Sequence, residues 1–172
     1  MMKLVGALII LMSSTWTGFE AARRLSERPR QLRQLKAALQ ALEAEIMYGQ
    51  VPVAEACSRI AAQTSKPLSW FFERFSKRLA QGDVASLSEA WLGSLKEVWK
   101  LTALKENDFE IMRQFGETLG RHDAISQKKH IQLAIVHLQR EEEDARTQQQ
   151  KYEKMVKSLG FLSGLLVVIL LM

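Results

Sequence analysis

The sequence predicts an all-α protein, an antiparallel bundle of about six helices with an apolar segment at each end of the chain. Apolar residues recur at steps of three and four in one segment after another, which is the period of an amphipathic helix. Strand signals are absent, because no stretch alternates apolar and polar residues and no Asn-Gly or Asp-Gly turn occurs. The chain has 172 residues, and the part between its apolar ends, roughly 135 residues, suffices for one modest domain.

Proline and glycine delimit the first three predicted helices. The first helix covers Pro29–Tyr48 and ends at Gly49. Pro52 and Pro67 fit the opening positions of the second and third helices, and Gly82 ends the third. The inward stripe of the first helix consists of Leu32, Leu35, Leu39, Leu42 and Ile46.

Capping residues mark the fourth and fifth helices. Ser86 with Glu89, and Asn107 with Glu110, each form a capping-box pattern before an apolar run, and Gly120 ends the fifth helix. The residues expected in the core, because they lie on inward stripes of different helices, are Phe71, Phe75, Trp91 and Leu119. Gly116 stands inside a predicted helix, where glycine costs up to ~1 kcal/mol relative to alanine, and a close helix crossing would explain it.

The last predicted helix is unusually long. Asp123 suits its N-cap, and the chain then contains no proline and no glycine until Gly160. One face stays apolar at every seventh residue, at Ile131, Leu138, Ala145, Tyr152 and Leu159. A continuous helix to Met172 would measure about 70 Å and would form a rigid stalk.

The two apolar ends suggest membrane anchors. Leu4–Phe19 and Ser158–Met172 carry no charge. As helices they would be about 24 Å long or slightly less, shorter than a bilayer core of ~30 Å. Flanking lysines that extend their ammonium groups to the membrane surface could make up the difference. We therefore expect transmembrane helices at 1–20 and 158–172, flanking a helical domain at 21–157. The alternative for the N-terminus is a cleaved secretion signal, although Ser13–Phe19 offers no convincing cleavage site.

Basic residues set the expected orientation. They flank the inner side of both apolar ends, at Arg23, Arg24, Arg28, Arg30, Arg33, Lys151, Lys154 and Lys157. The positive-inside rule then places the domain in the cytoplasm and both termini outside. The net charge of +5 comes largely from these flanks, where lipid headgroups would lie, which argues against nucleic-acid binding. Gly160 and Gly164 form a small-xxx-small face, so we expect the two spans to pack there.

Few residues offer chemistry. The single cysteine, Cys57, is expected to be a small core residue. His122, His130 and His137 invite a metal-site hypothesis, but the last two lie about 10.5 Å apart along one helix, which favours solvated histidines. Glu43 and Glu45 point to different faces and so form no acid–base pair. The sequence has no phosphate loop, nucleophile elbow or cysteine pair, and it predicts a non-enzymatic protein without cofactors.

The chain resembles the stage III sporulation protein AB family of endospore-forming bacteria along its whole length. Three blocks carry the resemblance: Leu42–Gly49 with Pro52, Phe115–Asp123 with Gln127, and Ser158–Gly160 followed by Gly164–Leu166. The family is similar to the cytoplasmic helical domain of F-type platform proteins in type II secretion and type IV pilus machines. This chain has one such domain and two expected spans, where a full platform has a duplicated domain and more spans, and a homodimer could supply the missing copy.

The resemblance implies a membrane platform that couples a cytoplasmic secretion-type ATPase, stage III sporulation protein AA, to the channel between mother cell and forespore. It also implies other channel proteins as partners and the mother-cell membrane around the forespore as location. The alternative is a passive membrane scaffold that spaces or dimerises other proteins.

Two polar clusters are candidates for the partner contact. The first is the helix end with Glu43, Glu45 and Tyr48, which we favour; the alternative is a helix terminus with Tyr48 packed over the Gly49 turn. The second is the acidic run with Glu141, Glu142 and Glu143, whose alternative is a solvated helix face.

Overall fold

The computed structural model describes residues 26–49, 51–82, 86–120 and 124–171. Arg28–Glu143 forms one compact unit, and the described residues on either side of it belong to a second. Within these ranges all regular structure is helical and no strand occurs, which confirms the all-α prediction. No helix among the described residues combines the length and the apolar character that crossing a membrane requires. The span expected at 1–20 lies outside the described residues.

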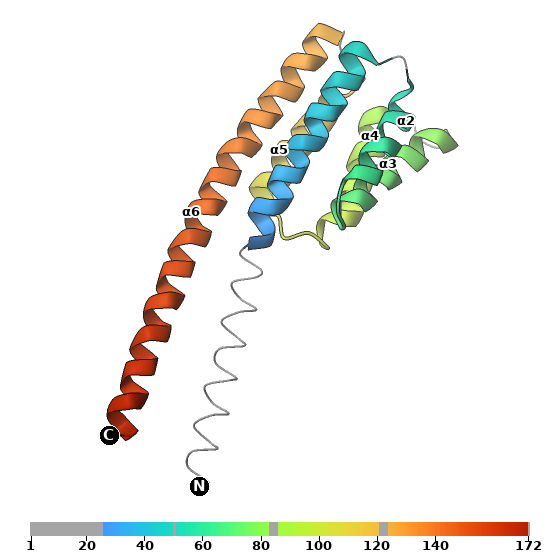
Figure 1. Ribbon diagram of the computed structural model, residues 1–172. Coiled ribbons are helices and arrows are strands. Elements are labelled where there is room, and N and C mark those ends of the chain that lie inside the picture. Colours follow the sequence, from blue (N-terminus) through green and yellow to red (C-terminus); the bar gives the residue numbers. More distant parts are fainter. Residues whose placement is uncertain (1–25, 50, 83–85, 121–123, 172) are drawn as a thin grey trace. The chain divides into compact units, whose positions relative to one another are not determined.

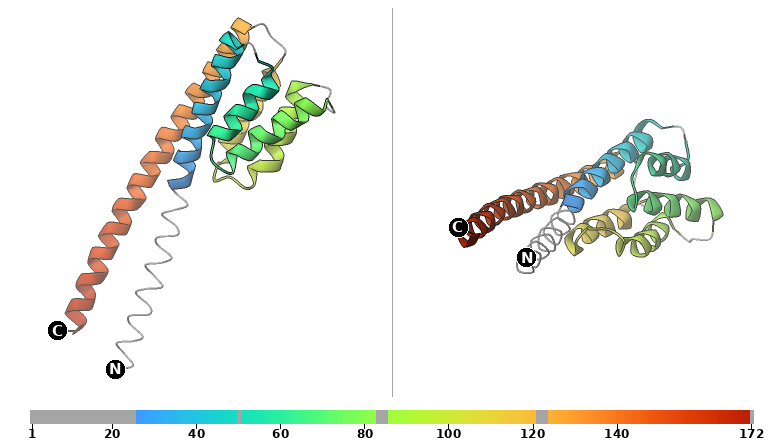
Figure 2. Two further views of the ribbon diagram at one scale, coloured as in Figure 1. Left: turned by 45° about the vertical axis from the view of Figure 1, so that its right-hand side comes forward. Right: turned by 60° about the horizontal axis from the view of Figure 1, so that its bottom comes forward.

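The described part of the chain contains a helix over residues 26–48, here called the N-terminal helix, and five more helices (Figure 1). They are α2 (Val53–Gln63), α3 (Leu68–Gln81), α4 (Leu87–Trp99), α5 (Glu106–Thr118) and α6 (Ala124–Leu171). From α2 to α5 each helix packs on the next along the chain. The N-terminal helix and the first part of α6 lie side by side in both figures (Figure 2). They run antiparallel, because Arg28 bonds to Glu141 while Glu43 bonds to Gln132.

Most predicted helix ends agree with the structure to within a few residues. Pro52 and Pro67 are the N-caps of α2 and α3, one position before the expected place. Gly82 ends α3 with a left-handed φ of 66°, a conformation that favours glycine. The Ser86 side chain accepts a hydrogen bond from the Glu89 backbone N–H at 3.1 Å, as the capping pattern predicted. The N-terminal helix is already helical at residue 26, so Pro29 does not open it.

The capping box expected from Asn107 and Glu110 is wrong. Helix α5 begins at Glu106, so Asn107 lies inside it. The side chain that caps this helix is Asp108, whose Oδ2 accepts from the Lys105 backbone N–H at 2.8 Å. Arg28 of the N-terminal helix bonds to the same carboxylate, as described below.

The core of the compact unit is built around Trp91. Its ring meets Phe71, Phe75 and Phe115 edge-on, with ring centroids 4.7, 5.1 and 5.2 Å away. The indole N–H donates to the Met112 carbonyl oxygen at 2.9 Å, so the polar atom of this buried ring is satisfied. The predicted core residues Phe71, Phe75, Trp91 and Leu119 are all buried, which confirms that part of the prediction.

Gly116 lies where α5 crosses Trp91 of α4. A Cβ at Gly116 would stand 2.1 Å from Cδ1 of the Trp91 ring, a distance that no carbon contact allows. The close helix crossing expected at this glycine is therefore confirmed.

Helix α6 is continuous over 48 residues, or about 72 Å. This confirms the unbroken last helix that the sequence predicted. Gly160 and Gly164 belong to this helix, but their packing lies outside what the structure describes, as does the expected N-cap Asp123.

Candidate partner-binding surfaces

A buried ion pair joins the N-terminal helix to α5 and α6. Arg28 donates from Nε to Asp108 Oδ2 at 3.0 Å, and from Nη2 to Asp108 Oδ1 at 2.8 Å and to Glu141 Oε2 at 2.6 Å. Asp108 is fully buried, and only 7% of Arg28 is exposed. Burial alone would lower the pKa of Arg28, but the hydrogen bonds and charges of the two carboxylates raise it above its ordinary value. The fork geometry satisfies both buried charges.

A second ion pair holds Glu142 against the N-terminal helix. Arg33 Nε lies 3.1 Å from Glu142 Oε1, and Lys36 Nζ lies 2.7 Å from Oε2, as a charge contact rather than a well-angled hydrogen bond. Burial would raise the pKa of Glu142, but the close contacts and positive charges of Lys36 and Arg33 outweigh it and lower this pKa. Glu142 is only 4% exposed. Glu143 is exposed and accepts a bond from Gln139 at 2.7 Å.

These pairs change the interpretation of two sequence features. Arg28 was expected among basic residues at lipid headgroups, and for this residue the expectation is wrong, because it is buried between carboxylates. The acidic run is only partly a solvated face, since Glu141 and Glu142 turn inward. Sequence reasoning missed the pairing of Arg28 with Asp108. A signal existed, because Asp108 lies on the same helical face as the buried Met112 and therefore predicts a buried charge.

The end of the N-terminal helix presents a different surface. Tyr48 is 81% exposed and so does not pack over the turn that follows it. Glu43 is half-buried and accepts from Gln132 Nε2 at 2.9 Å. The last turns of this helix border a pocket of about 200 Å³, lined by Leu42, Glu45, Ile46, Gly49, Val51, Val53 and Ala56. A carboxylate, an exposed phenol and a small apolar pocket thus lie together at this end.

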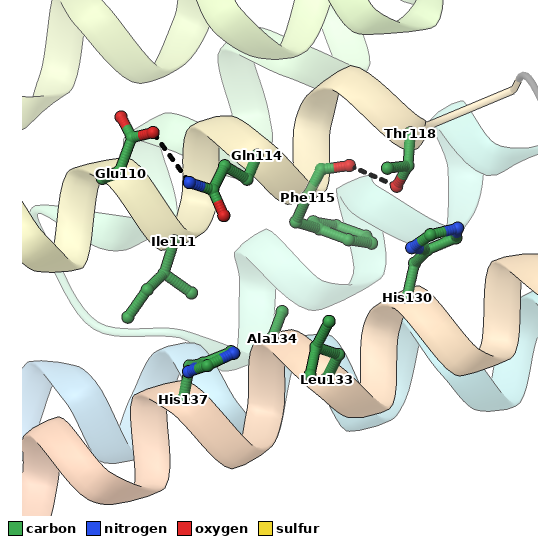
Figure 3. A pocket seen from close by; sticks show the side chains of 9 residues that line it. All are labelled: Glu110, Ile111, Gln114, Phe115, Thr118, His130, Leu133, Ala134 and His137. Carbon is green, nitrogen blue, oxygen red and sulfur yellow. Dashed lines mark hydrogen bonds between the residues drawn. The ribbon is translucent and has the colours of Figure 1, made fainter.

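A groove of about 250 Å³ runs between α5 and α6 (Figure 3). Its α5 wall consists of Glu110, Ile111, Gln114, Phe115 and Thr118, and its α6 wall of His130, Leu133, Ala134 and His137. Glu110 and His137 lie toward one end of this α5–α6 groove, and Thr118 and His130 toward the other.

The remaining candidates for chemistry are accounted for as follows. Among the described residues, no group of three or more His, Cys, Asp or Glu side chains could hold a metal ion. His122 lies outside the described residues. Cys57 is fully buried, as expected of a core residue, and burial raises the pKa of its thiol to about 12. It is therefore a protonated thiol at neutral pH.

The sequence model of the family described as stage III sporulation protein AB matches residues 3–172. The chain belongs to this family. A relative named stage III sporulation protein AB, from Bacillus subtilis (strain 168), is 55% identical over 172 residues, which are 100% of both chains. A solved structure titled stage III sporulation protein AB is 53% identical, with a TM-score of 0.70, and covers 73% of this chain and 98% of its own.

Membership of the stage III sporulation protein AB family places the chain among sporulation proteins. The names of these relatives describe a sporulation protein and mention no enzymatic activity. The high identity and the TM-score together also support the helical bundle fold.

Proposed function

We propose that this protein is a non-enzymatic membrane platform in a sporulation channel complex, where it couples a cytoplasmic secretion-type ATPase to the channel between mother cell and forespore. The observation that carries the proposal is the full-length match to a sporulation family, in a chain whose helical domain stands between two charge-free ends. The ATPase would be a stage III sporulation protein AA-like protein. Other membrane proteins of the channel would be further partners.

The apolar ends support membrane attachment. Leu4–Phe19 and Ser158–Met172 contain no charged residue, and helix α6 extends without a break to Leu171. The proposed location is the mother-cell membrane around the forespore, with two spans and the helical domain in the cytoplasm.

Cysteine accessibility tests this topology. The buried Cys57 should stay unlabelled in the folded protein, so a single new cysteine at the exposed Tyr48 would report its own position. We expect an impermeant thiol reagent to label Tyr48→Cys only after the cells are permeabilised. Labelling in intact cells would refute the orientation, and a shortened N-terminus by mass spectrometry would show that the first segment is a cleaved signal.

The surface proposed to contact the ATPase is the Glu43–Tyr48 helix end. An ATPase must bind and release its platform during turnover, which favours polar, salt-sensitive contacts. Glu45 supplies a carboxylate that lines the pocket at this end, and Tyr48 supplies an exposed phenol. Glu141 and Glu142 are held by basic residues of the N-terminal helix, which leaves Glu143 as the accessible carboxylate of that trio.

A co-purification of the full-length protein with the ATPase tests both the coupling and the surface. We expect Glu43→Lys with Glu45→Lys to abolish ATPase capture without changing helicity by circular dichroism. The matched control reverses Glu73 and Glu97, two exposed carboxylates on α3 and α4, and should leave capture intact. Loss of capture with Glu143→Lys but not with the first pair would move the contact to α6.

The second candidate function is a passive membrane scaffold. The observation that favours it is the uninterrupted length of α6. A long helix can hold two binding partners at a fixed distance from each other without any ATPase. A platform loses sporulation when the ATPase contact is removed, whereas a scaffold keeps it. Wild-type spore yield from a variant that no longer captures the ATPase would therefore support the scaffold.

A further inference from the structure

The α4–α5 loop, residues 100–105, presents an apolar side chain between two lysines. Leu101 is 56% exposed, and within residues 51–82 and 86–120 it is the only large apolar side chain that is exposed. Lys100 and Lys105, at the two ends of the loop, are exposed as well. One exposed leucine would need no explanation by itself. Here the bonding and the position of the loop supply one.

The backbone of the loop is bonded within the protein. Every backbone N–H from Leu101 to Lys105 donates to a protein oxygen. The first two donate to carbonyl oxygens in the last turn of α4, at 2.9 and 3.0 Å. The next three donate to the side-chain oxygens of Gln31, Thr102 and Asp108, at 2.8, 3.3 and 2.8 Å. Because no donor on this stretch depends on water, the loop can enter a poorly hydrated layer without leaving an N–H unpaired.

Two of these bonds hold the loop against the start of the N-terminal helix. Gln31, which bonds to Ala103, lies in that part of the helix. Asp108, which bonds to the last N–H of the loop, is itself joined to Arg28. Figure 1 shows the loop and the first turn of the N-terminal helix at the same end of the compact unit. The other end of this helix, at Tyr48, lies 20 residues or about 30 Å from Arg28.

A further basic and aromatic pair lies beside the loop. Leu68, the first residue of α3, and Thr102 of the loop line the same small apolar cleft. Two positions before Leu68, the ammonium group of the exposed Lys66 lies 5.4 Å from the centre of the Trp70 ring. Tryptophan and lysine are both favoured at membrane interfaces, where an apolar body and a polar tip can each find a suitable environment.

The chain comes within reach of the membrane at this same end. The charge-free N-terminal segment ends at Phe19, nine positions before Arg28. Nine residues span at most about 32 Å even when fully extended. In the proposed topology the N-terminal segment crosses the membrane, so the Arg28 end of the compact unit lies within that distance of the cytoplasmic surface.

We propose, on the basis of this proposed topology, that the α4–α5 loop docks on anionic phospholipid headgroups of the membrane that holds the chain's own ends. Leu101 enters the boundary between headgroups and acyl chains, while Lys100 and Lys105 contact lipid phosphates. A lysine near an anionic membrane surface strengthens binding about fivefold. The exposed Glu106 that follows the loop reduces this attraction but does not reverse it, since two lysines stand against one carboxylate.

The position of the loop favours lipid over a protein partner as its occupant. An acidic protein surface with an apolar cleft would suit the same side chains. A protein must be recruited to the loop, however, whereas the connection through Phe19 keeps the membrane within reach of the loop in every copy of the chain. Docking at this end would also leave the Glu43–Tyr48 helix end, about 30 Å away, accessible from the cytoplasm.

Fluorescence quenching by lipid-attached nitroxides tests the contact in the full chain, reconstituted in vesicles of phosphatidylcholine and phosphatidylglycerol. A fluorophore on an Asn107→Cys variant reports on the loop and leaves Leu101 in place. A fluorophore on a Tyr48→Cys variant reports on the opposite end of the helix. Both positions are exposed, and the native Cys57 is buried. We expect several-fold stronger quenching at position 107 than at position 48, and a clear decrease at position 107 when phosphatidylglycerol is omitted.

Two variants of the loop test the side chains. Leu101→Ser, and separately Lys100→Glu with Lys105→Glu, should each reduce quenching at position 107 to the level of position 48. Removing two lysine contacts alone corresponds to about 25-fold weaker binding. The matched control reverses Lys77 and Lys129, two exposed lysines on α3 and α6, and should leave quenching unchanged. All variants should keep the wild-type melting temperature, because the changed side chains are exposed.

Equal quenching at positions 107 and 48, in protein that floats with the vesicles, would overturn the lipid contact and leave the membrane topology standing. Protein that does not float with the vesicles would refute the anchoring and the contact together. Unchanged quenching in phosphatidylcholine alone would refute the recognition of anionic headgroups. Equal quenching combined with a lower spore yield of Leu101→Ser would assign the loop to a protein partner and overturn the lipid contact.

Discussion

Replacing Gly116 with alanine should destabilise the helical domain even though alanine is the better helix former. The added methyl would stand 2.1 Å from Cδ1 and 2.7 Å from Nε1 of Trp91. The indole cannot retreat, because Phe71 and Phe75 pack edge-on against it and its N–H is bonded to Met112. Overpacking costs about 1–3 kcal/mol, here at the upper end, and the gain in helix propensity returns at most ~1 kcal/mol.

The net loss of about 2 kcal/mol corresponds to a melting temperature lower by roughly 10 °C for a domain of this size. Gly93→Ala is the matched control, since the nearest atom to its new methyl is Nη1 of Arg78, the mobile end of a side chain, at 2.6 Å. It should be neutral or slightly stabilising. Thermal unfolding by far-UV circular dichroism measures both. A Gly116→Ala variant that melts within about 2 °C of wild type, with unchanged tryptophan fluorescence, would refute the close contact.

Three further predictions follow from burial and charge. Phe75→Ala should lose about 3–5 kcal/mol, whereas Lys77→Ala, which removes one exposed pair with Glu73, should lose at most about 0.5 kcal/mol; equal melting temperatures would show that the inward stripe was misassigned. The pKa of Glu142 is lower in the folded protein than in the unfolded chain. Its ionised carboxylate therefore stabilises the fold at pH values above the unfolded pKa, about 4.3. This contribution to the free energy of unfolding is lost as the pH falls through the folded pKa. Wild-type stability should thus fall more steeply in acid than that of Glu142→Gln, and parallel curves would contradict this. Cys57 should react with a thiol reagent only on unfolding, because its pKa is about 12; rapid labelling of the folded protein would argue against its burial.

The core of the domain could be predicted from sequence because its signals are local. Leu32, Leu35, Leu39 and Leu42 are all fully buried, and their spacing alone places them on one helical face. Gly116 was also informative, since a glycine inside a helix implies a neighbour that comes close. Such residues predict the buried face of their own helix and the presence of a close neighbour. They do not predict which distant segment supplies that neighbour.

The polar interactions could not be predicted, because they join residues far apart in the chain. Arg28 and Asp108 are 80 positions apart, and the composition around Arg28 is equally typical of a membrane flank. The same limit explains the misassigned cap of α5, where the carboxylate of Asp108 serves both the helix end and a distant arginine. Helical spacing can mark Asp108 as buried, but it does not identify the distant residue that pairs with it.

The bond between Arg28 and Glu141 spans 113 positions, and this separation sets a delay during synthesis. A ribosome adds about 5–20 residues per second, so roughly 6–23 s pass between the emergence of the arginine and that of its acceptor. Helices α2 to α5 can meanwhile assemble from contacts between chain neighbours. Leu35 and Leu42 of the N-terminal helix can already pack against α2, α3 and α4 at this stage. The bonds from the N-terminal helix to α6 must wait until the start of α6 has been synthesised, so this side of the domain is the last to be completed.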